Sequence, residues 1–283
     1  MSYLITGKTR VCALFGDPVE HTMSPVMHNA AFHKLQLDYV YVPFRVSKEE
    51  LGKAVAGVRA MNLRGFNVTI PHKIAVIPFL DKLDVMSQKL GAVNTVVNDR
   101  GIMTGYNTDS TGFLQSLLEK EIEPKEKRIT ILGAGGSARA IAIILADRGA
   151  QLTILNRHLE RARELAKDIS QNVKALTLND ENLSAVMANT EILINCTSVG
   201  MQKENETPAP ARLLRRNLVV VDIVYNPIET RLLREAKSVG AITVNGVDML
   251  AWQGAQGFEK WTGLKPPVEL MRKEAIKALT HEK

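Results

Sequence analysis

A glycine-rich turn between an apolar strand and a helix constrains the fold of this 283-residue chain more than any other feature. The run RITIL at 128–132 passes directly into this turn, whose residues are Gly133, Ala134, Gly135, Gly136, Ser137 and Ala138. The order strand, G-x-G-x-x-A, helix is the context that a dinucleotide-binding fingerprint requires. In that motif the first glycine forms the tight turn, the second admits a pyrophosphate, and the alanine permits close helix–strand packing. We therefore predict a nucleotide site where the first N–H groups of the helix face the phosphates.

Five β-rich runs lie between residue 128 and residue 245, and helix-length segments separate them. In order they read RITIL, QLTIL, EILIN, LVVVDIV and AITVN. Near-continuous apolar strands that alternate with helices indicate a parallel sheet covered on both faces. The pattern predicts a doubly wound, Rossmann-type domain in this part of the chain, whereas an isolated G-x-G-x-x-A sequence can be only a tight turn.

The residues after the second β-rich run bear on the choice of cofactor. NAD enzymes usually place Asp or Glu there, to accept hydrogen bonds from the adenosine ribose. Asn156 and Arg157 stand there instead, and Arg161 follows one helical turn later. Two guanidinium groups suit a 2′-phosphate, and Arg157 is also suited to stack on adenine, so the sequence favours NADP over NAD. The alternative is that both arginines are ordinary surface charges.

The first part of the chain also alternates strand and helix patterns, which predicts a second α/β domain. Ser24 is expected to be an N-cap with Pro25 at the first helical position, and Ser47-x-x-Glu50 reads as a capping box. The segment after residue 246 is expected to be helical. We expect strands at 10–16, 39–46 and 65–70, a strand within 91–99 that leads into a hairpin, and helices at 24–37 and 47–61.

The stretch FNVTIPHK, residues 66–73, alternates apolar residues with Asn67 and Thr69 and ends at a proline and Lys73. Its residues alone allow two interpretations. One is an edge strand with a solvent-exposed polar face and a solvated lysine, because most lysines are solvated. The other is a strand whose amide and hydroxyl line a cleft, with the lysine at its reacting end.

Composition excludes several classes of protein. The net charge is +6 and the pI about 9.3, but no basic stripe is interleaved with aromatics, so we expect no nucleic-acid partner. The longest apolar run, AIAIILA, is too short to span a bilayer, and the N-terminus lacks the apolar core of a signal peptide. Cys12 and Cys196 lie far apart and outside any C-x-x-C pattern, which favours a reducing cytoplasm. The six histidines form no metal-binding motif, so we expect no metal.

Several stretches together resemble the shikimate dehydrogenase family, which includes shikimate and quinate/shikimate dehydrogenases. They follow the family's order over nearly the whole chain and read FGDPVEHTMSPVMHNAAF, NVTIPHK, GAVNT, GYNTDSTGF, GAGGSARA, NRHLER, NCTSVGM, VYNPIETRLL and GVDMLAWQGAQGFEKWTG. The resemblance implies a substrate-binding catalytic domain of residues 1–109 and 246–283, an NADP domain of residues 110–245, and a cleft between them. It also implies reversible hydride transfer between C3 of shikimate and NADP, on the route to chorismate and the aromatic amino acids.

The resemblance assigns the chemistry to Lys73 and Asp109. A secondary alcohol gives up a hydride more readily as its proton departs, so the reaction needs a base at that oxygen. Lysine becomes a good base only when a dry cleft lowers its pKa, and a nearby aspartate opposes that change while it orients the lysine. The expectation is therefore the pair, with the proton acceptor left open. Capping of a helix N-terminus is the other role open to Asp109.

The remaining site residues follow from the same resemblance. Three of these residues have an alternative role that does not involve a ligand: Ser24 can cap a helix, Gln253 can simply be solvated, and the ring of Tyr225 can serve only for packing. Without the family resemblance, Gly246 and Met249 would be read as structural residues. The residues implied to bind substrate are Thr22, Ser24, Asn67, Thr69, Asn94, Tyr225 and Gln253. Those implied to bind the cofactor are Gly133, Ala134, Gly135, Gly136, Ser137, Ala138, Asn156, Arg157, Arg161, Thr197, Gly246 and Met249.

One departure from the family keeps an alternative open. Shikimate enzymes of the family commonly have Ser-x-Ser before the proline, and this chain has Thr22-Met23-Ser24. The added methyl group leaves open a quinate or broad-range quinate/shikimate dehydrogenase, although Asn156-Arg157 favours NADP and shikimate. A non-catalytic NADP sensor is the alternative outside enzymes, and it would not need Lys73 and Asp109. We expect a monomer or a homodimer.

Overall fold

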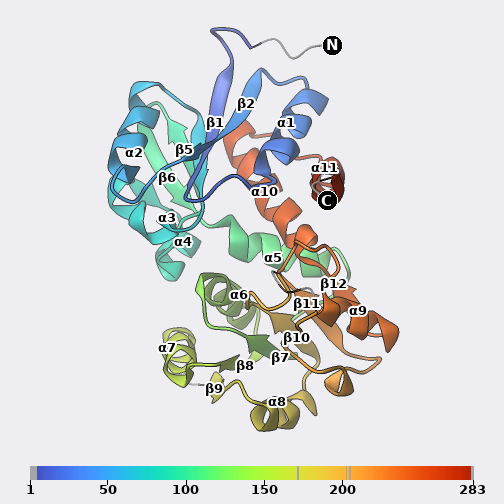
Figure 1. Ribbon diagram of the computed structural model, residues 1–283. Helices are drawn as coiled ribbons and strands as arrows, with labels where there is room; N and C mark the ends of the chain where they lie inside the picture. Colours follow the sequence, from blue (N-terminus) through green and yellow to red (C-terminus); the bar gives the residue numbers. More distant parts are fainter. Residues whose placement is uncertain (1–4, 171, 202, 204, 282–283) are drawn as a thin grey trace. The chain divides into compact units, whose positions relative to one another are not determined.

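The computed structural model describes residues 5–170, 172–201, 203 and 205–281, and it divides the chain into two compact units (Figure 1). The first unit holds the residues up to Thr108 and those from Ala251 onward, and the second holds Asp109–Leu250. Two helices carry the chain across the division, α5 (Thr108–Leu118) and α10 (Gly246–Thr262). The domain limits expected from the sequence, at residues 109 and 245, lie in the first turn of α5 and just before α10.

The first unit is built on a mixed six-stranded sheet in the order β2-β1-β3-β5-β6-β4. Strand β1 pairs in parallel with β2 and β3, whereas β5 runs antiparallel to β3 and β6. The expected hairpin is confirmed in β5 and β6. The strands are β1 (Arg10–Gly16), β2 (Tyr39–Arg45), β3 (Gly65–Val68), β4 (Lys82–Leu83), β5 (Thr95–Asp99) and β6 (Ile102–Tyr106).

Helices cover both faces of this sheet. The apolar side chains of α2 pack with Phe66, Val96 and other strand residues into one buried cluster on the first face. Helix α1 contacts both β2 and α11. At the sheet's centre the Trp261 indole of α10 donates to the Val96 carbonyl at 2.9 Å, and only a glycine fits at Gly65 beneath it, because a Cβ there would lie 2.5 Å from the indole nitrogen. The helices are α1 (Ser24–Lys34), α2 (Leu51–Ala60), α3 (His72–Ala75), α4 (Val85–Leu90), α11 (Val268–His281) and the 3₁₀ turn η1 (Ile77–Phe79).

Two helix starts differ from the sequence prediction. The N-cap of α1 is Met23, not Ser24, because the Met23 carbonyl already accepts the first helical bond from the Met27 N–H, at 3.3 Å. Only one of the two hydrogen bonds of the expected capping box forms: Ser47 Oγ accepts from the Glu50 N–H at 3.3 Å. Helix α2 starts after Glu50, and Glu50 makes no side-chain capping bond.

Strand β3 lies inside the sheet between β1 and β5, so it is not an edge strand. All of its residues are buried on both faces, and it ends at Val68, two residues earlier than expected. The alternation predicted for this strand is real: Phe66 and Val68 belong to the cluster beneath α2, while Asn67 faces the other side and bonds the Tyr41 hydroxyl. Of the polar face read from the sequence, Asn67 is only 7% exposed, whereas Thr69 is half-buried.

The second unit is a six-stranded sheet in the order β12-β11-β10-β7-β8-β9, with every pairing parallel. Counted from β7, this is the strand order 3-2-1-4-5-6 of a doubly wound dinucleotide fold, and the predicted Rossmann-type sheet is confirmed. The order reverses between β7 and β10, which makes their carboxyl ends the expected ligand crevice. The strands are β7 (Arg128–Leu132), β8 (Gln151–Asn156), β9 (Lys174–Thr177), β10 (Ile192–Asn195), β11 (Val219–Asp222) and β12 (Ile242–Val244).

The helices of the second unit pack in two pairs. Helices α8 and α9 pack with strand side chains such as Leu132 and Leu193 into one apolar cluster, while α6 and α7 contact each other. Right-handed crossovers on either side of the switch point place the two pairs on opposite faces of the sheet. The helices are α6 (Gly136–Asp147), α7 (Leu159–Ile169), α8 (Asp180–Met187), α9 (Arg231–Ser238) and the 3₁₀ turn η2 (Ala211–Leu213).

Two features are absent from the described part of the chain. None of its helices combines the length and the apolar character needed to cross a membrane. Within the same residues, no group of three or more His, Cys, Asp or Glu side chains is placed to hold a metal ion.

Candidate active site

The glycine turn lies at the switch point of the second sheet, directly after β7. Gly133 has φ +107°, and a Cβ there would lie 3.0 Å from the Cys196 carbonyl oxygen, so both the backbone and its neighbours require glycine. Gly135 is the N-cap of α6, and a Cβ on it would meet no described atom within 4 Å. Ala138 is fully buried where the helix meets the sheet. Open space above free helix N–H groups is what a pyrophosphate needs.

The end of β8 carries positive charge and no acid. Asn156 is the last residue of the strand, and its Nδ2 donates to the His158 carbonyl at 2.9 Å. Arg157 and Arg161 are exposed, and neither forms an ion pair within the part of the chain that the structure describes. Because no carboxylate neutralises these guanidinium groups, the surface fits an added phosphate better than a bare ribose diol.

Thr197 is held by a buried amide that the sequence analysis missed. Its N–H and its hydroxyl both donate to Asn195 Oδ1, at 3.0 and 2.7 Å. Asn195 ends β10 and donates through Nδ2 to Asp222 Oδ1 at 2.9 Å, across to the end of β11. The two strand ends are therefore tied together beside the glycine turn, where the Thr197 methyl would lie 3.3 Å from a Cβ at Gly133.

Asp222 is the centre of this network and is fully buried. It accepts from the Thr230 hydroxyl at 2.7 Å and from the Val224 N–H at 3.1 Å, besides Asn195. Burial raises the pKa of Asp222 to about 6, and the three hydrogen bonds oppose that rise. The sequence signal that could have revealed this network is the position of the two residues. Asn195 and Asp222 are polar and lie at the carboxyl ends of neighbouring parallel strands.

Three predicted residues follow β11. Gly246 begins α10, and a Cβ there would lie 2.5 Å from the carbonyl oxygens of Ile223 and Val224, so close backbone approach requires glycine. Tyr225, just after these carbonyls, and Met249, on α10, are both half-buried. The structural role of Gly246 is thus clear, and its role toward a cofactor stays a prediction.

In the first unit, Asn67 and Asn94 lie in one buried network of amides and hydroxyls. Asn67 Nδ2 donates to the Asn94 carbonyl at 3.0 Å and to Thr95 Oγ1 at 2.9 Å. Asn94 Oδ1 accepts from the Thr108 N–H at 2.8 Å, and Asn94 Nδ2 lies 3.0 Å from Thr108 Oγ1. The network joins β3 and β5 to the first residue of α5, and Asp109 is the next residue, in the first turn of that helix.

Lys73 lies in the short helix α3, directly after the strand that carries Asn67. Its carbonyl accepts from the Val93 N–H at 2.8 Å, and the buried His72 ring is 2.7 Å from the Val46 carbonyl through Nε2. These two contacts fix the backbone that presents the half-buried Lys73 side chain. His72 is a residue to which the sequence analysis gave no role, and its role here is to anchor α3.

Four other predicted residues of this unit are placed as follows. Thr22 Oγ1 accepts from the Ser24 N–H at 3.3 Å, so the hydroxyl of Thr22 organises the start of α1. Thr69 follows β3, and its N–H donates to the Phe15 carbonyl at 2.9 Å. Gln253 is half-buried on α10. The structure brings Thr22 to Ser24 and Asn67 to Asn94 directly, while Lys73 belongs to the first unit and Asp109 and Tyr225 to the second.

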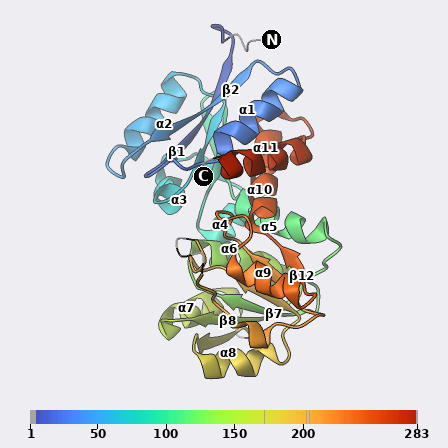
Figure 2. The same cartoon turned by 45° about the vertical axis from the view of Figure 1, so that its right-hand side comes forward.

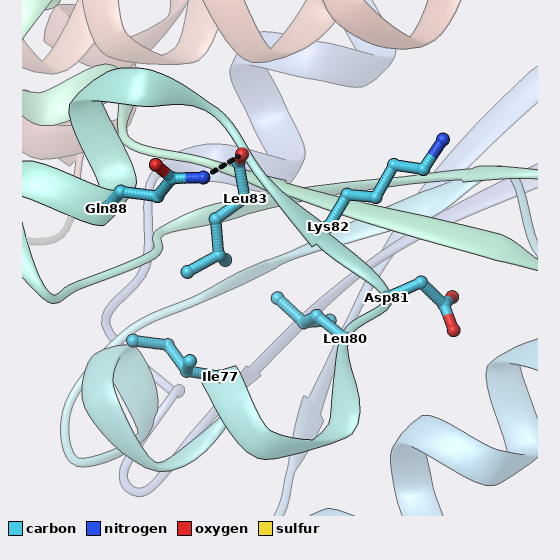
Figure 3. Close-up of a pocket in the computed structure, with 6 residues that line it drawn as sticks. All are labelled: Ile77, Leu80, Asp81, Lys82, Leu83 and Gln88. Carbon is cyan, nitrogen blue, oxygen red and sulfur yellow. Dashed lines mark hydrogen bonds between the residues drawn. The ribbon is translucent and has the colours of Figure 1, made fainter.

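A pocket of about 480 Å³ opens on the first unit away from all of the predicted residues. Ile77, Leu80 and Leu83 point into it, whereas Asp81 and Lys82 point away (Figure 3). Gln88 donates to the Leu83 carbonyl at 3.1 Å, so its amide is already engaged. Three of its six lining residues are apolar and three are polar or charged, and none of them is a predicted site residue, so this pocket does not alter the site described above.

The fold and the glycine turn define the class as a two-unit, dinucleotide-binding α/β protein. Three family models match along the chain: the shikimate dehydrogenase substrate binding domain at residues 14–96, shikimate / quinate 5-dehydrogenase at 116–248, and the shikimate 5′-dehydrogenase C-terminal domain at 246–276. The chain belongs to the shikimate dehydrogenase family.

Individual relatives agree with the family models. A shikimate dehydrogenase (NADP(+)) from Dehalococcoides mccartyi is 48% identical over 95% of this chain and 96% of its own length. A crystal structure of a shikimate dehydrogenase in complex with NADP+ is 43% identical with a TM-score of 0.92, covering 98% of each chain. The shikimate 5-dehydrogenase of Listeria monocytogenes, solved with shikimate and NAD, is 43% identical with a TM-score of 0.91, covering 96% of this chain and 98% of that one.

Proposed function

We propose that this protein is an NADP-dependent shikimate dehydrogenase, which catalyses the reversible reduction of 3-dehydroshikimate to shikimate. The observation that carries the proposal is the buried network from Asn67 to Thr108, between the segments that bear Lys73 and Asp109. Shikimate is a carboxylate with three hydroxyls, so its site needs short polar groups with fixed orientations, because an unpaired buried polar group weakens binding. A chain that only sensed NADP would not need this network.

The second unit is proposed to hold the cofactor. Gly133 makes the tight turn and Gly135 leaves the space that the pyrophosphate requires, while Arg157 and Arg161 are suited to the 2′-phosphate. NADP+, when bound, supplies the hydride acceptor for oxidation of the alcohol. The proposed set is completed by Ala134, Gly136, Ser137, Ala138, Asn156, Thr197, Gly246 and Met249.

Lys73 and Asp109 are proposed as the catalytic pair. In the oxidative direction a base removes the proton of the alcohol, and in the reductive direction the same group returns it. Lys73 projects from a helix whose backbone is anchored through Val93 and His72, and Asp109 follows a residue anchored by Asn94. Such anchoring supports a role that depends on orientation.

The first unit is proposed as the substrate-binding unit. Thr22 and Ser24 lie at the start of α1, where helix N–H groups favour the substrate carboxylate. Asn67, Thr69, Asn94 and Gln253 are proposed to bind the hydroxyls, with Tyr225 of the second unit as a further carboxylate ligand. We further propose a cytoplasmic monomer or homodimer with no nucleic-acid partner.

A crossed initial-rate assay tests the function. Purified protein receives shikimate or quinate, each with NADP+ or NAD+, and reduced-nicotinamide absorbance is followed. The expected result is fast turnover confined to shikimate with NADP+. Turnover on quinate that equals or exceeds this rate would make the protein a quinate/shikimate dehydrogenase with Thr22 as a specificity residue. NADP binding without turnover in all four mixtures would favour the sensor.

A further inference from the structure

The dipeptide His28-Asn29 has no part in the proposed chemistry, yet both of its side chains are directed at Tyr41. Asn29 Oδ1 accepts from the Tyr41 N–H at 2.8 Å, and Asn29 Nδ2 donates to the Tyr41 carbonyl at 3.0 Å. The His28 ring stacks on the Tyr41 ring with a centroid distance of 4.5 Å and an interplanar angle of 17°. Helix α1, which carries the pair, lies alongside β2 (Figure 2). One helix thus holds both the backbone and the ring of Tyr41.

His28 acts here as a neutral flat surface. It is fully buried, and neither ring nitrogen has a hydrogen-bond partner among the described residues. Burial lowers the pKa of His28 to about 3, so the ring carries no charge at neutral pH. The His28 ring packs among three aromatic rings, stacked on Tyr41 and tilted against Phe32 and Trp261, and these contacts offset the cost of burying it without a hydrogen bond.

The contacts of His28 and Asn29 with Tyr41 hold its hydroxyl in place. It donates to Asn67 Oδ1 at 2.7 Å, and Tyr41 is only 2% exposed. Burial raises the pKa of Tyr41 well above its usual value, so the hydroxyl stays a donor, while a hydrogen bond from Ser24 acts in the opposite sense. This buried hydroxyl therefore bonds a residue of the proposed substrate site, Asn67 on β3.

The Asn67 amide has little freedom left once Tyr41 is counted. An amide offers two N–H donors and two acceptor positions on its oxygen. Both donors are used, by the Asn94 carbonyl at 3.0 Å and by Thr95 Oγ1 at 2.9 Å, and Tyr41 takes one acceptor position. One acceptor position on Oδ1 remains.

We propose that Tyr41 is a positioning residue for the substrate, because it fixes Asn67 so that Oδ1 accepts a hydrogen bond from a substrate hydroxyl. Asn67 then accepts a hydrogen bond from the substrate and is unable to donate one. The inference rests on the proposed function for its substrate, shikimate. It goes beyond that function by naming a buried residue of β2, with no contact to the reacting atoms, that acts through Asn67.

The test is Tyr41→Phe, with Tyr39→Phe as the matched control. Both tyrosines are buried on the same face of β2, and the Tyr39 hydroxyl accepts from Arg10 at 2.7 Å, far from Asn67 in the hydrogen-bond network. Both variants lose one buried hydroxyl, so a merely structural effect would appear in both. We expect Tyr41→Phe to raise the KM for shikimate about tenfold, the effect of one lost hydrogen bond, with kcat and the KM for NADP+ within about twofold. Tyr39→Phe is expected to leave all three constants unchanged.

A double-mutant cycle with Asn67→Ala decides whether Tyr41 acts through Asn67. In that background Tyr41→Phe is expected to have no further effect on the KM for shikimate, and a full tenfold effect there would overturn the proposal. An unchanged KM in Tyr41→Phe itself would also overturn it. If Tyr41→Phe does not fold, Thr95→Val removes the bond on the opposite side of the same amide, and an unchanged KM for shikimate in that variant rejects the proposal. A wild-type protein that does not turn over shikimate would instead refute the proposed function, so the two failures are distinguishable.

Discussion

Arg157 and Arg163 lie close together in the sequence, yet their surroundings assign them different roles. Arg163 pairs with Glu160 at 2.9 Å on α7, while Arg157 has no ion-pair partner among the described residues. We expect Arg157→Asp to weaken NADP+ binding at least tenfold and NAD+ binding by no more than about twofold, because only NADP carries the phosphate that the new carboxylate repels. Titration calorimetry with both nucleotides measures this. Arg163→Asp is the control, and equal losses for both nucleotides in Arg157→Asp would show that this arginine does not read the 2′-phosphate.

The buried ring of His28 gives the protein a predictable weakness toward acid. Its folded pKa of about 3 lies below the ordinary value of 6.5, so only the unfolded chain takes the proton as the pH falls below about 6.5. Stability is therefore lost on acidification, by about 3 kcal/mol between pH 7 and pH 4.5. We expect His28→Phe to lack this loss, as measured by urea unfolding at the two pH values. His33→Gln, on the exposed side of α1, is the control, and parallel losses in wild type and His28→Phe would refute the assignment.

The elements β10, β11 and α9 are joined by Asp222, and this junction has the opposite pH dependence. The folded pKa of about 6 lies above the ordinary 3.8, so the folded protein holds the proton more tightly. The stability contribution is complete below about pH 4 and is lost as the pH rises through 6, by about 3 kcal/mol in total. We expect the free energy of unfolding of wild type, relative to Asp222→Asn, to fall over that range in urea titrations. A difference that stays constant from pH 4 to pH 7.5 would contradict this.

The elements that sequence predicted well are those with a strong local signal. The runs at 128–132 and 151–155 became β7 and β8 because each is rich in apolar and β-branched residues and is followed by turn residues. Strand β9 was missed because Lys174–Thr177 is short, only half-buried, and lacks an apolar run. The N-cap of α1 was predicted one residue too late. Ser24 has a side chain suited to capping, but the Met23 carbonyl accepts the first helical hydrogen bond and so makes Met23 the N-cap.

The sequence predicts candidate site residues but not the partners that hold their side chains. Asn67 and Asn94 were expected as substrate ligands, and nothing in their local sequence indicates that Asn67 spends both N–H groups inside the protein. The bonds from Tyr41 to Asn67 and from Asn195 to Asp222 join residues more than twenty positions apart, across strands whose pairing only the fold defines. Composition and periodicity do not reveal such long-range hydrogen bonds.

At the scale of the whole molecule, the proposed functions are divided between the two units, so catalysis can be impaired without loss of cofactor binding. Lys73→Ala changes the first unit, while the glycine turn and Arg157 belong to the second. We expect turnover of shikimate to fall by about 10²–10⁴-fold, the usual contribution of a general acid–base group, with the Kd for NADPH unchanged. Stopped-flow rates and nucleotide fluorescence report the two quantities. Lys82→Ala, an exposed lysine of β4, is the control, and near wild-type turnover in Lys73→Ala would remove this residue from the mechanism.

The division of the chain also sets an order of synthesis. All of Asp109–Leu250 leaves the ribosome before the residues that complete the first unit, among them Trp261, whose indole bonds Val96 at the centre of the first sheet. Helix α1 likewise waits for α11, its packing partner, which is translated after the whole second unit. The nucleotide-binding sheet is thus a continuous segment able to fold during translation, while Met1–Thr108 stays without part of its core until the residues from Ala251 onward have been made.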